Sequence, residues 1–364
     1  MPSLTGLGGG IELYLRQFLE ALHEARPSAA ITVVLAKELT LRRPELLSPS
    51  LRARLAVEGT GSVQRVVRIG EFVWRSTLAA KRARPTTIVC GHANFIMLSH
   101  LLARGSGAKL IALTYGVEAW NLARPLTVAA FRAAQRIFTI SAFTASQLVR
   151  ALDVPADRIG ILHNAVDVAR FTPGEPSSAV AEKLSKLARP RLITVCRLDA
   201  SEAYKGGDTV TRVLARHPKL VGSYIVVGDG TDRPRLERLA AELMVPVTFF
   251  GRASDEELAD LYRASDLFIM PSRKEGFGYV FIEAMACGLP VIAGSVDGSV
   301  DALAGGALGL LVNPWDLDEI AEAVRAQLSG KTPPAMRDPA LLHAEVSRRF
   351  NADVFSAKLA RLLP

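Results

Sequence analysis

Short apolar segments alternate with helix-like segments in two series, and this alternation is the feature that most constrains the fold. The apolar segments of the first series are residues 30–36, 86–91, 109–116 and 136–141. Those of the second series are residues 191–198, 223–230, 246–251, 266–272, 290–295 and 309–312. Strands that are apolar throughout belong to parallel sheets covered by helices on both faces. The pattern therefore predicts an α/β protein made of two doubly wound, Rossmann-like domains.

The length of 364 residues also favours two domains, because single compact cores are usually smaller. The segment 171–178 is rich in Pro, Gly and Ser and marks the expected boundary. We therefore expect a first domain over residues 1–172 and a second domain from residue 173. Only residues 1–7 precede the first glycine turn, and they contain Pro2 and Gly6. We expect the first strand to be missing or truncated, or the true start of the chain to lie earlier.

Composition indicates a folded protein of a reducing compartment. No apolar stretch reaches the roughly 18 residues that a membrane-spanning helix needs, and the first residues do not resemble a signal peptide. The three cysteines, Cys90, Cys196 and Cys287, lie in apolar surroundings. They are typical of buried thiols in a cytoplasmic protein, and we expect no disulfide framework or metal site from them.

Positive charge is concentrated in the first half of the chain. The net charge is +8, and residues 1–165 carry 20 Lys and Arg against 10 Asp and Glu. The segment 62–84 combines apolar residues near helical spacing with basic residues largely outside that stripe. A basic amphipathic helix can lie on an anionic membrane surface. The alternative is a helix that packs on the core and exposes a solvated basic face.

Two glutamates, Glu275 and Glu283, stand on either side of a glycine-containing turn at residues 276–278. The pattern places Glu275 in the turn after a strand and Glu283 more than one turn into the following helix. A pair of glutamates can perform glycoside hydrolysis only if both flank one bond, and this spacing is poor for that. It suits the two ends of an extended ligand, whose anionic part is held by helix N-terminal amides. Two unrelated surface charges remain the alternative.

The segment 271–294 resembles the E-x7-E signature of the retaining glycosyltransferases of family 4, which have the GT-B fold. Further segments match that family in order, among them residues 161–173, 194–208, 224–230, 247–272 and 306–324. The resemblance covers nearly all of the second half and is looser in the first. It implies two Rossmann-like domains that face a cleft, with the acceptor bound by the first and the nucleotide sugar by residues 173–345. It also implies that a final helix, within residues 346–364, crosses back to the first domain.

The resemblance also implies the roles of individual residues on the donor side. Glu275, Arg197 and Lys205 take the catalytic positions, with the two cations on the donor diphosphate and Glu275 on the hexose. Glu283 accepts hydrogen bonds from the ribose hydroxyls. The further donor-binding positions are Gly9, Gly10, Arg252, Gly276, Phe277, Gly278 and Tyr279. Among these, Arg252 belongs to the segment expected against the nucleobase, and Gly9 and Gly10 to the turn before the first helix.

The acceptor side departs from the family pattern. Tyr115 stands where many members have a histidine, and Glu118 follows in the same element. His92 ends another strand and is an alternative for that role, although a strand-end histidine bonded to a neighbour is an equally good interpretation. No Asp-x-Asp element suggests a metal. We therefore expect neither a metal nor another cofactor.

The function implied by the resemblance is hexosyl transfer with retention of configuration. The expected donor is a nucleotide diphospho-sugar, with GDP-mannose preferred and a UDP-sugar as the alternative. The expected acceptor is a lipid-linked saccharide in bacterial surface polysaccharide synthesis, without nucleic acid as a partner. The expected location is the cytoplasm, peripheral on the inner face of the cell membrane. A sugar-nucleotide-binding protein without turnover and a nucleotide-sugar epimerase are the remaining hypotheses.

Overall fold

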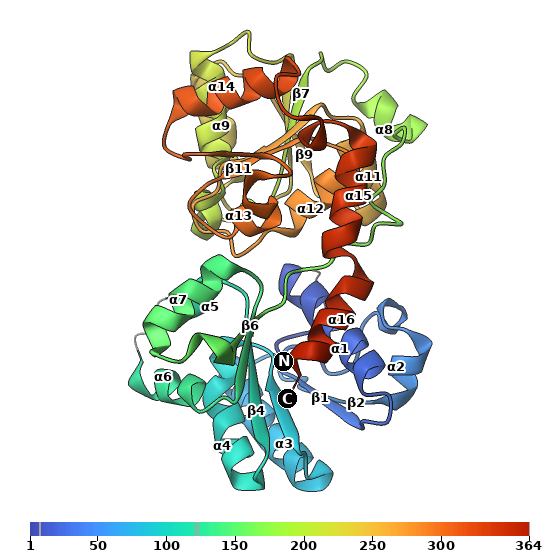
Figure 1. Ribbon diagram of the computed structural model, residues 1–364, viewed down its shortest axis with the longest axis vertical. Coiled ribbons are helices and arrows are strands. Elements are labelled where there is room, and N and C mark those ends of the chain that lie inside the picture. Colours follow the sequence, from blue (N-terminus) through green and yellow to red (C-terminus); the bar gives the residue numbers. More distant parts are fainter. Residues whose placement is uncertain (7–8, 121, 123, 364) are drawn as a thin grey trace. The chain divides into compact units, whose positions relative to one another are not determined.

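The computed structural model describes residues 1–6, 9–120, 122 and 124–363, and the chain forms two compact units (Figure 1). Unit 1 comprises Met1–Ala165 and Ala352–Pro364, and unit 2 comprises Val166–Asn351. The segment after Ala165 belongs to unit 2 because Val166 donates a backbone hydrogen bond to Phe350 (2.7 Å). The boundaries between the two units therefore lie at 165/166 and 351/352. The sequence pattern had predicted these boundaries at 172/173 and 345/346.

Unit 2 contains one parallel sheet of six strands, and all six were expected from the second apolar series. The strands are β7 (Arg191–Val195), β8 (Ser223–Val227), β9 (Val247–Gly251), β10 (Leu267–Met270), β11 (Val291–Gly294) and β12 (Leu310–Val312). The helices are α8 (Ser178–Lys183), α9 (Gly207–Arg216), α10 (Arg233–Glu242), α11 (Asp255–Arg263), α12 (Tyr279–Ala286), α13 (Ser299–Ala302), α14 (Leu317–Leu328) and α15 (Pro339–Phe350).

The strand order in unit 2 is β12-β11-β10-β7-β8-β9, which is the doubly wound order with a reversal between β7 and β10. Helices α9, α10 and α14 pack together, and helices α11, α12, α13 and α15 form a second connected group (Figure 1). Every strand in this sheet except the edge strands β9 and β12 is largely buried, which explains why the strands are apolar throughout.

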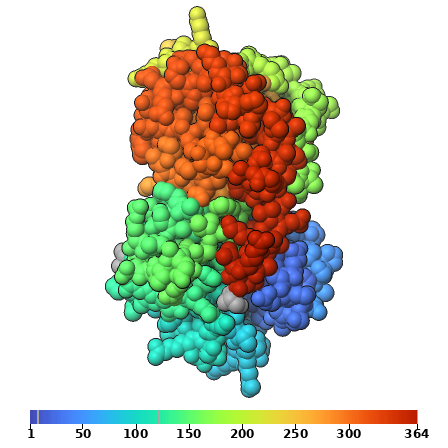
Figure 2. All heavy atoms as spheres, viewed as in Figure 1, coloured from blue at the N-terminus to red at the C-terminus, as the bar shows by residue number. Residues whose placement is uncertain are grey.

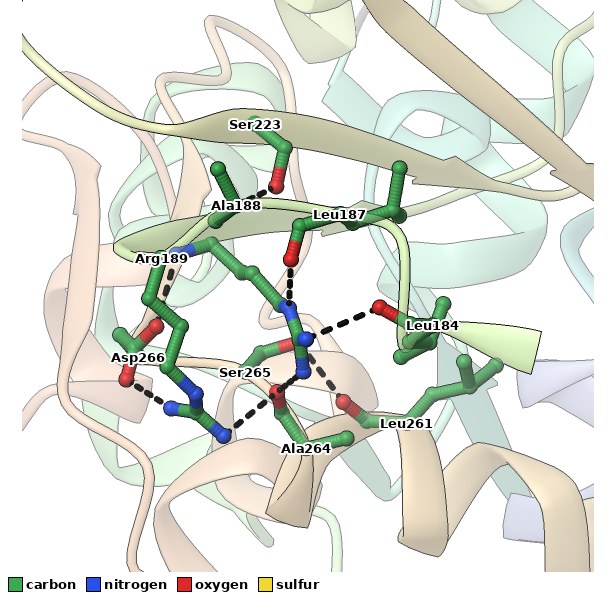
Figure 3. Close-up of polar contacts among 10 residues, drawn as sticks. Leu184, Leu187, Ala188, Arg189, Ser223, Leu261, Ala264, Ser265 and Asp266 are labelled. Carbon is green, nitrogen blue, oxygen red and sulfur yellow. Dashed lines mark hydrogen bonds and ion pairs between the residues drawn. The ribbon is translucent and has the colours of Figure 1, made fainter. Parts of the chain in front are cut away.

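A cluster of arginine contacts joins the starts of β7 and β10. Arg191 donates from its backbone to Asp266 (2.7 Å), and its guanidinium donates to the carbonyls of Leu187, Ala264 and Leu184. Figure 3 shows the neighbouring Arg189 directed at Asp266 and Ala264. These contacts fix the position of β10 beside β7 at the amino ends of the strands. The opposite ends, which carry the candidate site, are positioned by the same register.

Unit 1 contains two parallel sheets, β1-β2 and β3-β4-β5-β6. The strands are β1 (Ile31–Leu35), β2 (Leu55–Gly59), β3 (Thr87–Cys90), β4 (Lys109–Thr114), β5 (Arg136–Thr139) and β6 (Ile159–Ile161). The helices are α1 (Gly10–Ala25), α2 (Pro49–Arg54), α3 (Arg65–Ala83), α4 (Ile96–Ser106), α5 (Val117–Trp120), α6 (Pro125–Arg132), α7 (Ala142–Leu152) and α16 (Ala352–Leu362). The sequence pattern missed β2, which contains the charged Glu58, and β6, which is only three residues long.

The first residue lies against the free edge of β1. The Met1 amino group donates to the Val34 carbonyl (2.8 Å), and the Met1 carbonyl accepts from the Ala36 amide (3.0 Å). This is the pairing of one residue in a parallel ladder. Met1 is therefore the only residue of the described chain in a strand-like position between β1 and β3.

Helix α16 returns to unit 1 and packs on α1, where Tyr14 meets Phe355 edge to face at 5.5 Å (Figure 1). Figure 2 shows α16 on the surface of the molecule beside the N-terminal segment of the same unit. This crossing helix begins later than the expected helix around residues 346–363. Asn351 adopts an extended conformation (ψ 170°) between α15 and α16, and it divides the segment into one helix for each unit.

Candidate functional site

Three candidate residues of unit 2 gather where the strand order reverses. Arg197 follows β7, and Lys205 ends a short 3₁₀ segment, Ala200–Lys205, before α9. Glu275 lies in the turn between β10 and α12. Since β7 and β10 are neighbours, their carboxyl ends bring these turns to one edge of the sheet. Open α/β sheets bind ligands at this reversal point.

A carboxylate that the sequence analysis did not single out joins the two cations. Glu202 binds the Lys205 ammonium through one oxygen (2.7 Å) and lies 3.3 Å from the Arg197 guanidinium through the other. The Lys205 and Glu202 side chains are largely buried, with about one sixth of each exposed, whereas Arg197 is 62% exposed. Buried charges require partners of opposite sign. Glu202 supplies that partner for Lys205 and orients Arg197.

Lys205 and Glu275 also interact electrostatically. Burial alone lowers the pKa of Lys205, but the carboxylates of Glu275 and Glu202 outweigh it and raise that pKa. Burial raises the pKa of Glu275, with Asp297 adding to the effect and Lys205 opposing it. The structure therefore brings together three of the predicted residues, Arg197, Lys205 and Glu275. It adds Glu202 as the group that balances their charge.

A buried aspartate holds the turn that carries Glu275. Asp297 is 1% exposed and follows β11. Its carboxylate accepts hydrogen bonds from the Glu275 amide (2.7 Å), the Ser272 hydroxyl (2.8 Å) and the Ser299 amide (2.9 Å). The carbonyl of Glu275 in turn accepts from the Gly298 amide (2.8 Å). Both backbone groups of Glu275 are thereby fixed, so its side chain projects from a turn of defined shape.

The glycine just before α12 is required by the backbone. Gly278 has φ 90°, and a Cβ there would lie 2.5 Å from the Phe281 ring. Gly276 is buried, and its amide donates to the Glu275 carboxylate (3.2 Å). Phe277 is fully buried, and its ring packs edge to face against Phe350. Tyr279 is half-buried and begins the helix.

Glu283 lies in an apolar environment on α12, separate from the partners of Glu275. Its side chain accepts a hydrogen bond from the Tyr262 hydroxyl (3.3 Å), and both residues are buried. Burial raises the pKa of Glu283 to about 7, with Asp255 adding to the effect. The two glutamates have no common partner among the described contacts, which argues against an acid/base pair at one bond. Arg252, predicted near the nucleobase, follows the edge strand β9 and is exposed.

The predicted acceptor-side residues meet at the carboxyl ends of β3 and β4 in unit 1. The Tyr115 hydroxyl donates to the Gly91 carbonyl (2.9 Å), and the ring lies 6.3 Å from that of His92. Glu118 accepts hydrogen bonds from the amides of Tyr115 (2.5 Å) and Gly116 (3.2 Å), and burial raises its pKa. The hydroxyl of Tyr115 therefore already donates its hydrogen bond to the protein backbone.

His92 is neutral at physiological pH. Its pKa is lowered to about 4, chiefly by burial and then by the charges of Lys37 and the Met1 amino group. Its Nδ1 accepts a hydrogen bond from the Asn94 amide (3.1 Å). The proton of the neutral ring therefore lies on Nε2, which is left as a donor.

The glycine turn of unit 1 precedes α1. Gly9 and Gly10 are exposed, and a Cβ on Gly9 would meet no other atom within 4 Å. Gly8 lies outside the described residues. No close approach of the fold therefore requires glycine at position 9.

Sequence reasoning missed Glu202 and Asp297. Glu202 precedes Lys205 by three residues, a spacing at which opposite charges often pair, and this was the available signal. Asp297 depends on β11 lying beside β10, which local sequence does not reveal. Among residues 1–6, 9–120, 122 and 124–363, no group of three or more His, Cys, Asp or Glu side chains could hold a metal ion.

Two family models match the chain, one over most of unit 1 and one within unit 2. The model described as Glycosyltransferase Family 4 matches residues 8–170, and the model described as Glycosyl transferases group 1 matches residues 189–329. The chain belongs to glycosyltransferase family 4. The family assignment from the sequence is thereby confirmed.

Curated relatives of this family 4 chain include D-inositol 3-phosphate glycosyltransferases. The protein of Mycobacterium sp. (strain JLS) is 35% identical over 216 residues, which are 58% of this chain and 48% of that relative. The protein of Mycolicibacterium smegmatis is 33% identical over 238 residues, 63% of this chain and 54% of that relative. The chain thus spans about half the length of the curated relatives that it matches.

Solved structures of similar architecture confirm the GT-B fold of this family 4 chain. Anabaena Alr3699/HepE in complex with UDP has a TM-score of 0.78 at 19% identity, covering 99% of this chain and 98% of that one. Sucrose-phosphate synthase from Thermosynechococcus elongatus has a TM-score of 0.75 at 23% identity, covering 98% and 93%. At these identities the likeness establishes the fold alone.

The raised pKa of Glu283 predicts a specific dependence of stability on pH. The unfolded glutamate ionises near 4.5 and the folded one near 7, so between these values only the folded state retains the proton. The free energy of unfolding therefore falls as pH rises through this window, by up to about 3 kcal/mol. Glu283→Gln, which cannot ionise, lacks this fall. Urea unfolding of both proteins at pH 4.5, 6 and 8 measures the difference, and an unchanging difference would contradict the assignment.

Proposed function

We propose that the chain transfers a hexosyl group from a nucleotide diphospho-sugar to an acceptor hydroxyl with retention of anomeric configuration. The observation that carries the proposal is the cluster of Arg197, Lys205 and Glu275 at the reversal point of the unit 2 sheet. Two cations suit a diphosphate leaving group, and a fixed carboxylate beside them suits sugar hydroxyls.

The proposed reaction is a front-face displacement. The bond from the anomeric carbon to the donor phosphate oxygen breaks, and a bond to the acceptor oxygen forms on the same face. The acceptor proton passes to the departing phosphate oxygen, so the products are the glycoside and a nucleoside diphosphate. Arg197 and Lys205 stabilise the charge that develops on that oxygen. No protein group has to act as a base.

Binding of the donor requires the two cations to exchange their carboxylate partner for a phosphate group. Glu202 already contacts both cations, so a diphosphate competes with its carboxylate for Lys205 and Arg197. The exposed Arg197 can move at small cost, whereas Lys205 is held in a largely buried position. We therefore assign the fixed phosphate contact to Lys205 and the adaptable contact to Arg197.

The turn between β10 and α12 is assigned to the hexose and the phosphate. Glu275 is anchored through both of its backbone groups, so its carboxylate is preorganised to accept hydroxyl hydrogen bonds. The backbone of Gly276 to Tyr279 stands at the N-terminus of α12, where the helix dipole favours an anion. The deeper Glu283 is assigned to the ribose hydroxyls, which donate best to its ionised form. Arg252, with the segment after β9, is assigned to the nucleobase side.

No metal or cofactor is part of the proposal, because Arg197 and Lys205 supply the positive charge that a leaving diphosphate needs. In unit 1, His92 and Glu118 are assigned to the acceptor side. His92 offers Nε2–H as a donor, whereas the Tyr115 hydroxyl is bound to Gly91. Gly9 and Gly10 are assigned to the donor diphosphate because they lie at the start of α1.

The identity of the donor and the acceptor is a finer proposal. GDP-mannose and a lipid-linked saccharide of a surface polysaccharide are the pair preferred on the family resemblance. A UDP-sugar is the second candidate, since a structural neighbour has been solved in complex with UDP-glucose. The names of the curated relatives add an inositol phosphate as an acceptor to test. A sugar-nucleotide-binding role without turnover is the alternative to transfer.

Helix α3 is the proposed membrane-contacting surface. Its buried face consists of Phe72, Ser76 and Ala79. Most apolar residues at the start of α3 and just before it are exposed, although the sequence pattern placed many of them on one apolar stripe. The exposed fraction lies between 42% and 92% for Val63, Val66, Val67, Ile69, Val73 and Trp74. Arg65 is exposed and Arg68 half-buried beside this patch. Exposed apolar residues with arginines suit an anionic lipid surface. Such peripheral contact, on the cytoplasmic side, is the proposed location.

No helix within the described parts of the chain is both long and apolar enough to cross a membrane.

Glu275→Gln tests the transfer proposal. Losing the carboxylate should lower the transfer rate at least 100-fold, the effect of removing a charged transition-state contact, while nucleoside diphosphate binding stays within about threefold.

Lys205→Ala should instead weaken nucleoside diphosphate binding by roughly 1.5–3 kcal/mol. Lys186→Ala, an exposed lysine of the same unit, is the control. Calorimetry and a radiolabelled transfer assay measure both quantities. An active Glu275→Gln protein would contradict the role of Glu275.

A donor screen tests the nucleobase and the hexose. GDP and GDP-mannose are expected to raise the unfolding temperature of unit 2 more than UDP and UDP-glucose do at equal concentration, because a ligand that binds the folded state stabilises it. Thermal unfolding followed by fluorescence gives the comparison. Stronger protection by the uridine pair would replace GDP-mannose with a UDP-sugar. If a nucleotide sugar raises the unfolding temperature but no hexose is transferred to lipid-linked acceptors, the sugar-nucleotide-binding role without turnover would be favoured.

Liposome sedimentation tests the α3 surface. Combining Arg65→Ala, Arg68→Ala and Trp74→Ala should reduce binding to vesicles that contain phosphatidylglycerol by at least about tenfold, since each basic contact contributes about 1 kcal/mol. Binding to neutral phosphatidylcholine vesicles should be weak for both proteins. Arg104→Ala, an exposed arginine on α4, provides the matched control. Equal sedimentation of the triple variant and the unmodified protein would rule out α3.

A further inference from the structure

The segment that leads into the glycine turn of unit 1 is held by a buried carboxylate. Glu38 lies in the loop after β1, residues 36–43, and is 2% exposed. Its Oε2 accepts hydrogen bonds from the backbone amides of Leu4 (3.0 Å) and Thr5 (3.2 Å). Hydrogen bonds to a carboxylate are stronger than those between neutral groups. Glu38 therefore ties the loop after β1 to the residues just before the glycine turn.

Further contacts hold the same segment. The Thr5 side chain is fully buried, and its hydroxyl oxygen accepts from the backbone amides of Arg42 (2.9 Å) and Arg43 (3.3 Å). The Arg16 guanidinium on α1 donates to the Leu4 carbonyl (3.0 Å). The segment is thus bound by the loop after β1 and by α1, so the glycine turn starts from a fixed position.

Two glycines of this region are required for different reasons. A Cβ on Gly6 would lie 2.6 Å from Glu38 Oε1 and 2.6 Å from the Ser3 hydroxyl oxygen. A Cβ on the exposed Gly9 would meet no other atom within 4 Å. The close approach of the Glu38 carboxylate therefore requires glycine at position 6, whereas position 9 is open to a ligand.

The second carboxylate oxygen of Glu38 shows that this residue does more than fill space. Oε1 is buried, and no donor among the residues that the structure describes bonds it. A buried polar atom without a partner is costly, and an apolar side chain would fill the same space without that cost. Filling the space therefore does not explain a carboxylate at position 38, whereas holding two backbone amides does.

Unit 2 contains the same device at its own candidate site. Asp297, which is 1% exposed, follows β11 and accepts from the Glu275 amide in the turn after the neighbouring strand β10. Glu38 follows β1 and accepts from the segment before α1. In each unit, a buried carboxylate of one loop fixes the backbone of a second segment that leads to a proposed substrate contact.

We propose that Glu38 is a positioning residue for the donor, because it holds residues 4–6 so that the turn at Gly9 and Gly10 has the shape that binds the diphosphate. This inference rests on the proposed function, which assigns that turn to the donor. Glu38 acts through the backbone and does not touch the donor, since its carboxylate is buried within unit 1. A turn held in its binding shape loses less conformational freedom when the ligand binds, so donor affinity depends on this anchor.

Substitution of Glu38 in the full chain tests the proposal. Glu38→Ala removes the acceptor of two amides, so those of Leu4 and Thr5 should exchange with solvent at least about tenfold faster. The Kd for GDP or UDP, whichever the unmodified protein binds more tightly, should rise at least about tenfold. Glu38→Gln keeps an oxygen for both amides and should stay within about threefold of the unmodified protein in both measurements. Mass spectrometry of the peptide that contains residues 3–6 measures the exchange, and calorimetry measures the Kd.

Three further variants separate positioning from general stability. Phe131→Leu alters a fully buried side chain in the core of unit 1, so it should lower the unfolding temperature and leave the Kd within about threefold. Glu24→Ala removes an exposed carboxylate at the end of α1 and should change neither quantity. Gly6→Ala places a Cβ against Glu38 Oε1 and should raise the Kd as Glu38→Ala does.

The opposite results overturn the proposal. Unchanged nucleoside diphosphate binding by Glu38→Ala, beside weakened binding by Lys205→Ala, would reject the positioning role and leave the proposed function standing. An equal rise in Kd for Phe131→Leu would show that Glu38 only stabilises unit 1. A rise for Glu38→Gln as large as for Glu38→Ala would show that the two amide hydrogen bonds are not the cause. Absence of nucleoside diphosphate binding to the unmodified protein would reject the proposed function and this inference together.

Discussion

The candidate site depends on one buried carboxylate. Asp297 is almost inaccessible to solvent, and three donors converge on it from the turn after β10 and from the start of α13. A donor left unpaired in such a place costs about 1–3 kcal/mol, so the turn has little freedom to change shape. The position of Glu275, the sharp backbone at Gly278 and the start of α12 all follow from that turn. Glu283 in turn is buried because α12 begins where it does.

Carboxylates already offset the two cations of the site before any ligand arrives. Arg197 and Lys205 carry two positive charges, and Glu202, Glu275 and Asp199 supply up to three negative ones, since Asp199 lies 3.8 Å from Arg197. Net attraction of anions would therefore not explain how the proposed diphosphate is selected. Under the proposed function, a phosphate oxygen replaces the Glu202 carboxylate at the fixed Lys205 ammonium, and the geometry of the ligand decides which anion completes this exchange.

The position of a candidate residue was predictable from sequence wherever it follows from a place after a strand. Arg197, Lys205 and Glu275 each lie in a strand-to-helix turn. The apolar pattern predicted the winding of unit 2, and the motifs in these turns indicated the family. Glu202 and Asp297 were not predictable in this way, because their partners come from neighbouring turns that only the folded sheet brings together. The strand β2 was missed because Glu58 interrupts its apolar pattern, and β6 because a pattern is hard to recognise in three residues. The break at Asn351 was missed because the apolar spacing continues across it, although α15 and α16 serve different units.

The return of α16 has a consequence for synthesis of the protein. Unit 2 is continuous in sequence from Val166 to Asn351, whereas unit 1 consists of the first 165 residues and the last helix. Domains generally fold as units while the chain leaves the ribosome from its N-terminus. Unit 2 can therefore complete its core while α1 still exposes the face on which Phe355 later packs. The N-terminal half, which is made first, is the half that finishes last.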